Sequence, residues 1–524
     1  MNPDLSHVPE SPTLPRSAEG AARGFDVADL YRGPLAQPSA GEGPALDEKL
    51  RQAYFWIVNQ AIISTHYDIE YQEGPSAGFS FGDSKALVEL PSGQSYSSFV
   101  LLPLLTFATR RRCLFIGGPG RGKTASAVLM GVLAGYSVSE VRRGMQHGHP
   151  QMTVADLLGS PLPADLVRAE SAAEIRIAWR SWLSMRVRII DEYNRIPTRT
   201  QSALLTVLGD NYAELYDQIY ECPEAAWFLT ANDDAGGGTY PVIEALRDRI
   251  DVVVQALAFN NRFLPQLLDR VEQGYRPEEV VPSRLVFTPD ELDAMHGEVL
   301  AVALPGPVRR RLEFFASQFE FFEPAGAQLE YMTKDTARLA GVDLHLLASG
   351  ETGRDRVADV GAQTRNGLSV RTLQTLLVYS KALAFFRGQP VVGLEDLRQV
   401  IPFVLHEKLL PDLDAPFFEG AGNQVLRVDR VGWVRRLFDL SCAEYDRLDL
   451  DREDPVGAML AEFGAGLQGV SEEETRRRLQ EIERLLQAWS GGRKLYGTVY
   501  DDVLVCKYLH QRYTNYLRWL TWSG

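Results

Sequence analysis

A short apolar run at residues 113–116 leads directly into Gly-Gly-Pro-Gly-Arg-Gly-Lys-Thr, which has the spacing G-x-x-x-x-G-K-T. Glycines at this spacing let successive backbone N–H groups turn toward a phosphate chain. The lysine offers a positive charge to the β and γ oxygens, and the threonine hydroxyl is suited to coordinating Mg²⁺. The helix expected to follow adds the positive end of its dipole. The sequence therefore predicts a P-loop, or Walker A motif, that binds a nucleoside triphosphate with Mg²⁺.

The predicted phosphate site is a run of nine consecutive residues. Within it, Lys123 is the expected phosphate cation and Thr124 the expected metal ligand. The complete set is Gly117, Gly118, Pro119, Gly120, Arg121, Gly122, Lys123, Thr124 and Ala125.

Length and charge limit the classes of protein to consider. A chain of 524 residues is long enough for about three or four domains. Its net charge of −15 argues against a nucleic-acid backbone as the main partner, because phosphates would be repelled. The N-terminus lacks a signal-peptide pattern, and the longest apolar run, 99–107, is too short to span a membrane. We therefore expect a cytoplasmic protein without a membrane span.

The chain divides by composition and periodicity into an N-terminal part and an α/β core. Residues 1–44 are rich in Pro, Gly, Ser and Ala, which predicts a disordered arm. Residues 45–98 predict an N-terminal extension of one helix and short strands. Residues 99–259 alternate apolar runs with helical stretches, which is typical of a parallel sheet flanked by helices. The predicted strands are 114–116, 187–190, 227–230 and 252–254.

The second half of the chain has helical periodicity. Residues 260–410 predict a helical lid, interrupted near 325–368 by an inserted region without clear periodicity. Residues 411–524 predict a mostly helical C-terminal region. Its last helix carries Trp519 and Trp522, which fit either core and subunit packing or a docking surface for a partner.

An acidic pair follows the second predicted strand. Asp191 and Glu192 are expected at the carboxyl edge of the sheet, beside the P-loop. There Asp191 would face Mg²⁺ and Glu192 would orient the attacking water as a base, in the manner of a Walker B motif. Asn232 follows the next strand and could hydrogen-bond both this water and the γ-phosphate.

Two arginines and a histidine pair are ambiguous from the residues alone. Arg249 precedes the last strand and fits either a contribution to a neighbouring subunit's site or a salt bridge with Asp248. Arg371 opens a lid helix and could reach the γ-phosphate. His147 and His149 have the spacing of a metal pair, but without further ligands they do not predict a metal site.

Taken in order, these segments resemble the AAA+ ATPases and, more narrowly, the MoxR branch. The matching segments are GGPGRGKT, DEYNRIP, TAN, TYPVIEALRDRID and SVRTLQTLLVYSKALAFFRG with VGLEDLRQVIPFVL, which together span about 99–410. The resemblance implies an AAA+ P-loop core followed by a helical lid, and Asp191 and Glu192 as the metal-side and catalytic carboxylates. It further implies Asn232 as the sensor-one residue, Arg249 as the arginine finger and Arg371 as the sensor-two residue.

The chain departs from the family pattern at three places. Asp233 and Asp234 replace the usual continuation after the sensor asparagine, Arg247 stands where an apolar residue is common, and 325–368 is longer than usual. The second departure leaves open whether Arg247 shares the finger role. Arg195, in the family's Asn-Arg pair, fits either a contact with a neighbouring subunit or a salt bridge at a helix start.

The resemblance also implies an activity. It implies a hydrolase that converts ATP to ADP and phosphate with Mg²⁺, works as a ring, usually a hexamer, and remodels client proteins as a chaperone. A partner with a von Willebrand factor A domain often accompanies the family. Two other functions remain open: a nucleic-acid motor related to helicases, which the charge disfavours, and a slow nucleotide switch that holds an assembly together.

Overall fold

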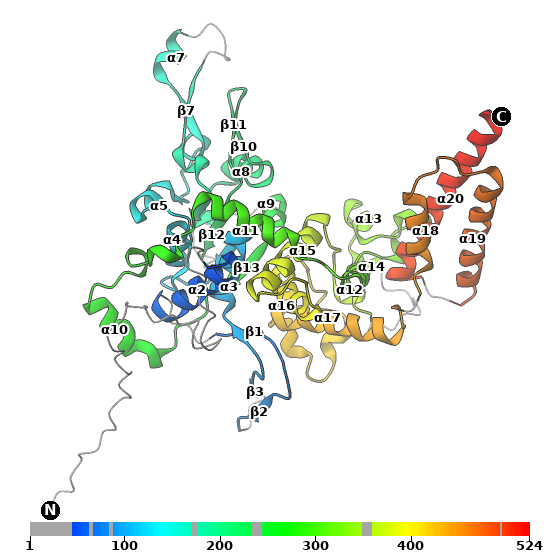
Figure 1. Ribbon diagram of the computed structural model, residues 1–524, viewed down its shortest axis with the longest axis horizontal. Helices are drawn as coiled ribbons and strands as arrows, with labels where there is room; N and C mark the ends of the chain where they lie inside the picture. The colour runs from blue at the N-terminus through cyan, green and yellow to red at the C-terminus, as the bar shows by residue number, and fades with distance from the viewer. Residues whose placement is uncertain are drawn as a thin grey trace, which may run out of the picture. The chain divides into compact units, whose positions relative to one another are not determined.

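The computed structural model describes residues 44–61, 66–82, 87–168, 175–232, 244–347, 359–451, 453–492 and 495–523 (Figure 1). The arm expected to be disordered lies outside the described residues except for Pro44, and so do Asp233 and Asp234. Ala45–Gly524 form one compact unit.

A parallel sheet of five strands lies at the centre of the core, in the order β13-β5-β12-β9-β6 (Figure 1). Four of the strands confirm those predicted from apolar runs. The other, β6, has no predicted counterpart because it is only two residues long and neither is apolar. The bounds are β5 Arg112–Ile116, β6 Gln146–His147, β9 Val187–Asp191, β12 Ala226–Ala231 and β13 Val252–Gln255.

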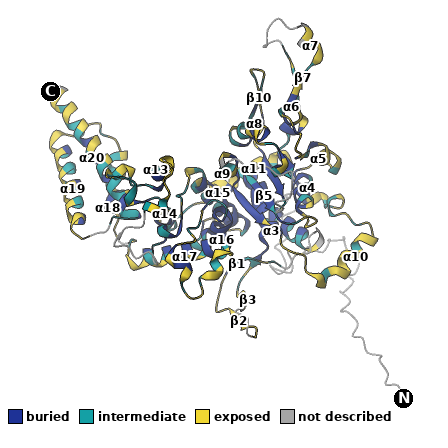
Figure 2. Ribbon diagram, turned by 180° about the vertical axis from the view of Figure 1, so that it is seen from behind, coloured by how far each residue is buried: buried dark blue, intermediate teal, exposed yellow. Residues whose placement is uncertain are grey.

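Side chains along the strands alternate between two hydrophobic clusters, one on each face of the sheet. Phe115 and Phe228 belong to one cluster, whereas their neighbours Leu114 and Leu229 belong to the other. The central strands are therefore buried on both faces (Figure 2), as parallel sheets require. Helices α3 (Ser98–Thr109) and α4 (Lys123–Leu133) contribute to the first cluster, and α8 (Thr198–Asp210) contributes to the second.

Two antiparallel hairpins that the sequence did not predict interrupt the core. One pairs β7 (Gly159–Pro161) with β8 (Ile177–Trp179), and the other pairs β10 (Tyr212–Leu215) with β11 (Gln218–Glu221). Both project from the same end of the core (Figure 1). The helices that accompany them are α5 Val138–Gly144, α6 Val154–Leu157 and α7 Pro163–Arg168.

The N-terminal extension packs against the lid. Strand β1 and lid helix α16 are joined by two hydrogen bonds, because Gln399 accepts from the Glu70 N–H at 3.1 Å and donates to the Glu70 carbonyl at 2.7 Å. Tyr71 donates to Asp396 of the same helix at 2.8 Å. The extension contains α2 Leu46–Trp56, the strand pair β1 Ile69–Glu70 and β4 Ser95–Tyr96, and the hairpin β2 Ala77–Ser80 and β3 Leu87–Leu90.

Most of the described residues after β13 are helical, as predicted for the lid and the C-terminal region. The inserted region contains two short helices, α13 and α14. The bounds are α9 Glu244–Arg249, α10 Leu264–Glu272, α11 Pro289–Ala301, α12 Gly306–Ser317, α13 Lys334–Leu339, α14 Leu344–Leu347, α15 Val370–Phe386, α16 Leu394–Leu405, α17 Arg430–Arg447, α18 Pro455–Gly464, α19 Glu472–Ser490 and α20 Thr498–Ser523.

The last three helices share a small hydrophobic cluster of their own. Leu509 and Tyr513 of α20 are buried in it, which is the packing role expected for part of this helix. Trp519 and Trp522 lie beyond it and are 56% and 88% exposed. Among the described residues, no single helix is both long and apolar enough to cross a membrane, although the bent pair α4 and α5 meets that test jointly.

Candidate nucleotide site

The phosphate loop connects β5 to α4 through three glycines with positive φ. Gly117 has φ 150°, and a Cβ there would lie 2.5 Å from the carbonyl oxygen of Ala256. Gly120 and Gly122 have φ 71° and 79°, a region in which other residues are strained. Gly122 is also the N-cap of α4, so the loop ends at the N-terminus of a helix. This is the strand, loop and helix arrangement that the sequence predicted.

Lys123 is held at the mouth of the loop by three oxygen atoms. Its Nζ donates to the carbonyl oxygens of Gly117 and Gly118 at 2.6 and 2.8 Å, and to Asn232 Oδ1 at 2.9 Å. Asn232 follows β12, which pairs with β5 in the sheet. The structure thus brings the predicted phosphate cation and the predicted asparagine into direct contact.

Asp191 ends β9 and accepts hydrogen bonds from two threonines. Thr124 Oγ1 donates to Asp191 Oδ1 at 2.8 Å, and Thr230 Oγ1 donates to the same oxygen at 2.6 Å. His147 Nδ1 of β6 lies 3.5 Å from the other carboxylate oxygen. The Thr124 hydroxyl and the Asp191 carboxylate fit Mg²⁺, which is usually bound by one or two protein oxygens together with substrate phosphates.

Glu192 has an uncommon backbone conformation that sets its carboxylate beside Asn232. Its φ is 54°, and its N–H donates to Thr230 Oγ1 at 2.9 Å. Asn232 Nδ2 donates to Glu192 Oε1 at 2.9 Å, and Arg195 Nε lies 3.1 Å from Glu192 Oε2. Arg195 therefore forms the salt bridge that was one of its two expected roles. Such strain in a non-glycine residue is typical of a functional site.

A cavity of about 470 Å³ adjoins the loop beside α4. It is lined by the α4 residues Ala125, Ser126 and Leu129, and by segments from the extension and from the chain after β13. The Ser126 hydroxyl is buried without a hydrogen-bond partner among the described residues. Burial raises the pKa of Asp68, which also lines the cavity and accepts from the N–H and hydroxyl of Ser98 at 2.9 and 2.8 Å.

The sequence analysis missed this cavity and also Thr230. The cavity walls come from three stretches of the chain, 66–99, 120–129 and 255–278, and only the second of these contains a motif. Thr230 did carry a signal, because it is a polar residue at the end of an otherwise apolar strand. Its side chain holds Asp191 and the Glu192 backbone together.

Arg249 and Arg371 lie at the opposite edge of the sheet from the P-loop. Strand β13 is parallel to β5, with Val252 paired to Cys113, so the end of α9 lies beside the start of β5. Arg371 Nη1 donates to Asp248 Oδ2 of α9 at 2.8 Å, and Ser369 donates to the other Asp248 oxygen at 2.9 Å.

Arg249 is only partly satisfied. Its Nη1 donates to the Ala245 carbonyl at 3.0 Å, and its Nε is buried without a partner among the described residues. Asp248 therefore pairs with the lid arginine rather than with either of its neighbours on α9. The structure unites the P-loop residues with Asp191, Glu192 and Asn232, and separates them from both predicted arginines.

Two protein families match this chain. Residues 112–252 match the ATPase family associated with various cellular activities (AAA), and residues 357–427 match the AAA lid domain. The chaperone MoxR1 of Mycobacterium tuberculosis is 24% identical over 316 residues, which cover 60% of this chain and 71% of that protein. A crystal structure of a protein named as an ATPase, from Cytophaga hutchinsonii, aligns with a TM-score of 0.44 at 19% identity, covering 63% of this chain and 88% of that one.

The matched core contains the P-loop, the acidic strand end and the asparagine on neighbouring strands, and the matched lid contains the helices that follow. These features and the similarity to MoxR1 identify the chain as a MoxR-type AAA+ ATPase.

Proposed function

We propose that this protein hydrolyses ATP in a ring of identical subunits and uses the cycle to remodel or activate client proteins. The position of Arg249 and Arg371 is the observation that supports assembly into a ring. Both lie at the edge of the sheet opposite to their own P-loop, and one acidic residue, Asp248, separates Arg249 from Arg247 and binds Arg371. An arginine that stabilises the transferring phosphoryl group then has to come from a neighbouring copy.

Within one subunit, the residues for water activation are already in contact. Glu192 would accept the proton of the attacking water, while Asn232 orients both the carboxylate and the water. Lys123 would exchange its carbonyl partners for the β and γ oxygens of ATP. Thr124 and Asp191 would hold Mg²⁺, which neutralises phosphate charge when bound. Arg195 holds the second oxygen of Glu192 and would release it when ATP binds.

The lid arginine links this chemistry to movement. Arg371 opens α15, and Thr375 on the same helix donates to Asp251 at 2.6 Å. Transfer of Arg371 from Asp248 to a neighbour's γ-phosphate would therefore pull on α15 relative to the core. We propose that this movement acts on the client, in a chaperone-like role suggested by the similarity to MoxR1, in the cytoplasm and with a hexameric ring. A protein with a von Willebrand factor A domain is the proposed accessory partner.

Mixing two inactive variants tests the shared site. Arg249→Ala protein keeps an intact P-loop, and Lys123→Ala protein keeps an intact arginine, so mixed rings contain some complete sites. We expect each variant alone to be inactive and the mixture to regain measurable ATP turnover, with size measured with and without ATP. A mixture that stays inactive while both variants assemble normally would contradict the shared site. Turnover that rises with single- or double-stranded DNA would instead favour a nucleic-acid motor.

A further inference from the structure

A second cavity of about 520 Å³ lies where the lid meets the core. We call it the seam cavity. It is lined by Arg247 and Asp248 of α9, by Lys408 after α16, and by Glu320, Asp335 and Arg338 near the inserted region. None of these residues belongs to the P-loop or to its cavity. The seam cavity is therefore a separate site.

Two cations of the seam cavity lack partners. The Nζ of Lys408 is buried and has no hydrogen-bond partner among the described residues. The Arg247 side chain, which is exposed, likewise makes no hydrogen bond or ion pair within the part of the chain that the structure describes. A buried ammonium without a partner is costly, so its position calls for a compensating anion.

No acidic residue of the lining forms a hydrogen bond or ion pair with Lys408 or Arg247 among the described residues. Asp248 is bound by Arg371 and Ser369, and Asp335 lies 3.5 Å from Arg338. Glu407 lies 4.0 Å from Arg430. Glu320, the remaining acid, accepts from the Asp335 N–H at 3.2 Å, and burial raises its pKa. Among the described residues of the lining, the charged groups left without a hydrogen-bond or ion-pair partner are therefore the two cations, Lys408 and Arg247.

The pKa of Lys408 is consistent with this imbalance. Burial lowers it, and the positive charges of Arg371 and Arg111 lower it further, against the opposing effect of Asp251 and Asp248. An anion placed beside Lys408 would reverse the effect of burial.

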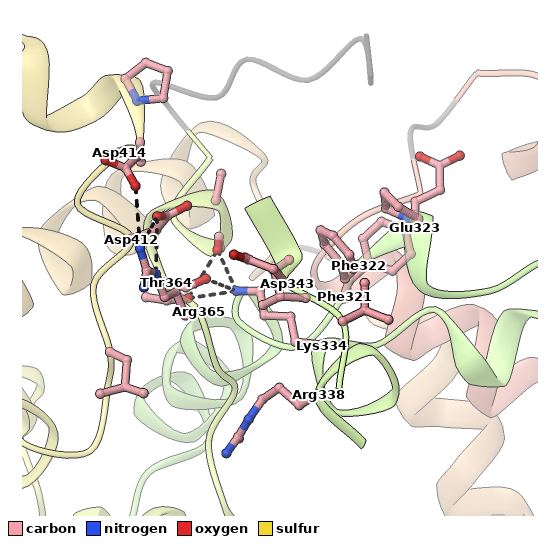
Figure 3. Close-up of a pocket in the computed structure, with 18 residues that line it drawn as sticks. Phe321, Phe322, Glu323, Lys334, Arg338, Asp343, Thr364, Arg365, Asp412 and Asp414 are labelled. Carbon is pink, nitrogen blue, oxygen red and sulfur yellow. Dashed lines mark hydrogen bonds and ion pairs between the residues drawn. The ribbon is translucent and has the colours of Figure 1, made fainter. Parts of the chain in front are cut away.

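A neighbouring lid cavity of about 270 Å³ provides the contrast (Figure 3). Its lysine, Lys334, donates to the carbonyl oxygens of Gly361 and Thr364 at 2.6 and 2.8 Å and to the Thr364 hydroxyl at 2.8 Å. Its arginine, Arg365, pairs with Asp412 at 3.3 Å. Cations in this region of the fold are thus normally satisfied by the chain itself, which sets Lys408 and Arg247 apart.

We propose that the seam cavity binds a small phosphate-bearing anion, with Lys408 and Arg247 as its cations. The anion is either free phosphate or a phosphate ester, since the cavity has room for more than a phosphate group. Arg247 belongs to the core and Lys408 to the end of the lid, so a bound anion joins the two beside the Asp248–Arg371 pair. The nucleotide site and the lid would then be subject to an effector that is not ATP.

Thermal unfolding and calorimetry of the full chain test this site. Lys123→Ala serves as the background, which removes the phosphate cation of the P-loop and makes the result independent of ATP hydrolysis. We expect inorganic phosphate or ribose 5-phosphate to raise the unfolding midpoint of this protein. Adding Lys408→Met or Arg247→Gln should weaken binding by about tenfold or more, the loss expected for one charge-assisted hydrogen bond. The tighter of the two ligands identifies the source of the phosphate group.

The matched control is Arg338→Gln, which removes a cation from the same cavity that already has an acidic partner. It should leave phosphate binding within about twofold, because its charge is neutralised by Asp335. Lys408→Met should also unfold at a higher temperature than the background when no anion is present, since it removes a buried unpaired charge. Equal affinities with and without Lys408, or no binding of either ligand, would overturn the proposal.

Discussion

The two edges of the central sheet differ in how their charged groups are satisfied. At the carboxyl edge, Lys123, Asp191 and Glu192 each have a partner within 3 Å. At the amino edge and its seam with the lid, Arg249 and Lys408 keep buried nitrogen atoms without partners among the described residues. Both edges belong to the same sheet.

The chain thus provides hydrogen-bond partners for the charged groups at the carboxyl edge, whereas at the amino edge some charged groups have none among the described residues. Groups at the carboxyl edge hold one another in position for a ligand that every subunit binds for itself. A buried donor without a partner costs about 1–3 kcal/mol, so the amino edge carries a penalty that another molecule can relieve. The occupants that we propose are a neighbouring subunit's nucleotide at Arg249 and a small anion at Lys408.

Removing the base at the carboxyl edge should have the largest effect. Glu192→Gln keeps the hydrogen bond from Asn232 but cannot accept a proton, so we expect ATP hydrolysis to fall by about 10²–10⁴-fold while ATP still binds. Phosphate release and calorimetry measure the two properties. Glu221→Gln, the same substitution at an exposed position of β11, is the control. Unchanged hydrolysis in Glu192→Gln would show that the contacts of this edge serve structure alone.

A substitution at the amino edge should act mainly on stability. The Asp251 carboxylate is buried, accepts from the Arg112 N–H at 2.9 Å and from Thr375 at 2.6 Å, and lies 3.7 Å from Arg111. Asp251→Ala leaves these donors unpaired, so we expect the free energy of unfolding to fall by about 3 kcal/mol. Urea unfolding measures this. Thr375→Val, which removes one of the three partners, should cost only about 1 kcal/mol, and an equal loss in both variants would contradict the central role of the carboxylate.

The sequence predicted the carboxyl edge well because its chemistry is local. The P-loop spacing fixes a strand, a turn and a helix within a dozen residues, and an apolar strand ending in Asp191 and Glu192 leaves few alternatives. Helix starts are equally local, since Thr288 and Ser471 cap α11 and α19 by accepting from the N–H of Glu291 and of Glu474. In each case the interaction joins residues close in the chain.

The amino edge could not be predicted for the opposite reason. Asp248 pairs with Arg371 across more than a hundred residues, and Asp251 with Thr375 likewise. From the sequence, Asp248 could equally pair with its neighbour Arg249, which was one of the two roles open for that arginine. The two core hairpins were missed because their strands are short and, apart from β8, lack the apolar run that marks β13. Tertiary contacts decide such elements, and periodicity does not show them.

The Asp248–Arg371 pair allows a more sensitive test of the same contrast. Both side chains are about one third exposed, so Asp248→Asn should change the free energy of unfolding by less than about 1 kcal/mol. It should nevertheless alter ATP turnover in the assembled protein, because Arg371 loses the residue that holds it away from a neighbour. Urea unfolding and steady-state kinetics measure the two effects. The control is Asp446→Asn, which breaks a comparable pair with Arg311 away from the sheet. A change in stability without a change in turnover would place Arg371 outside the catalytic cycle.

Ser126 tests the difference between the two edges of the sheet, because its hydroxyl is buried at the carboxyl edge and yet has no hydrogen-bond partner among the described residues. Its hydroxyl lines the cavity beside the P-loop, on the α4 turn that follows Lys123. Removing an unsatisfied hydroxyl should leave stability within about 1 kcal/mol, and Ser126→Ala should unfold no more easily than the parent protein. If the hydroxyl contacts the base or ribose, ATP binding weakens by about threefold to tenfold in this variant, as measured by calorimetry. A weaker affinity would show that Ser126, like Lys408 in our proposal, is a buried group whose partner is a ligand. Buried groups without a partner would then mark ligand contacts at both edges. An unchanged affinity for ATP would show that Ser126 only packs in the fold, and that buried groups without a partner mark ligand contacts at the amino edge alone.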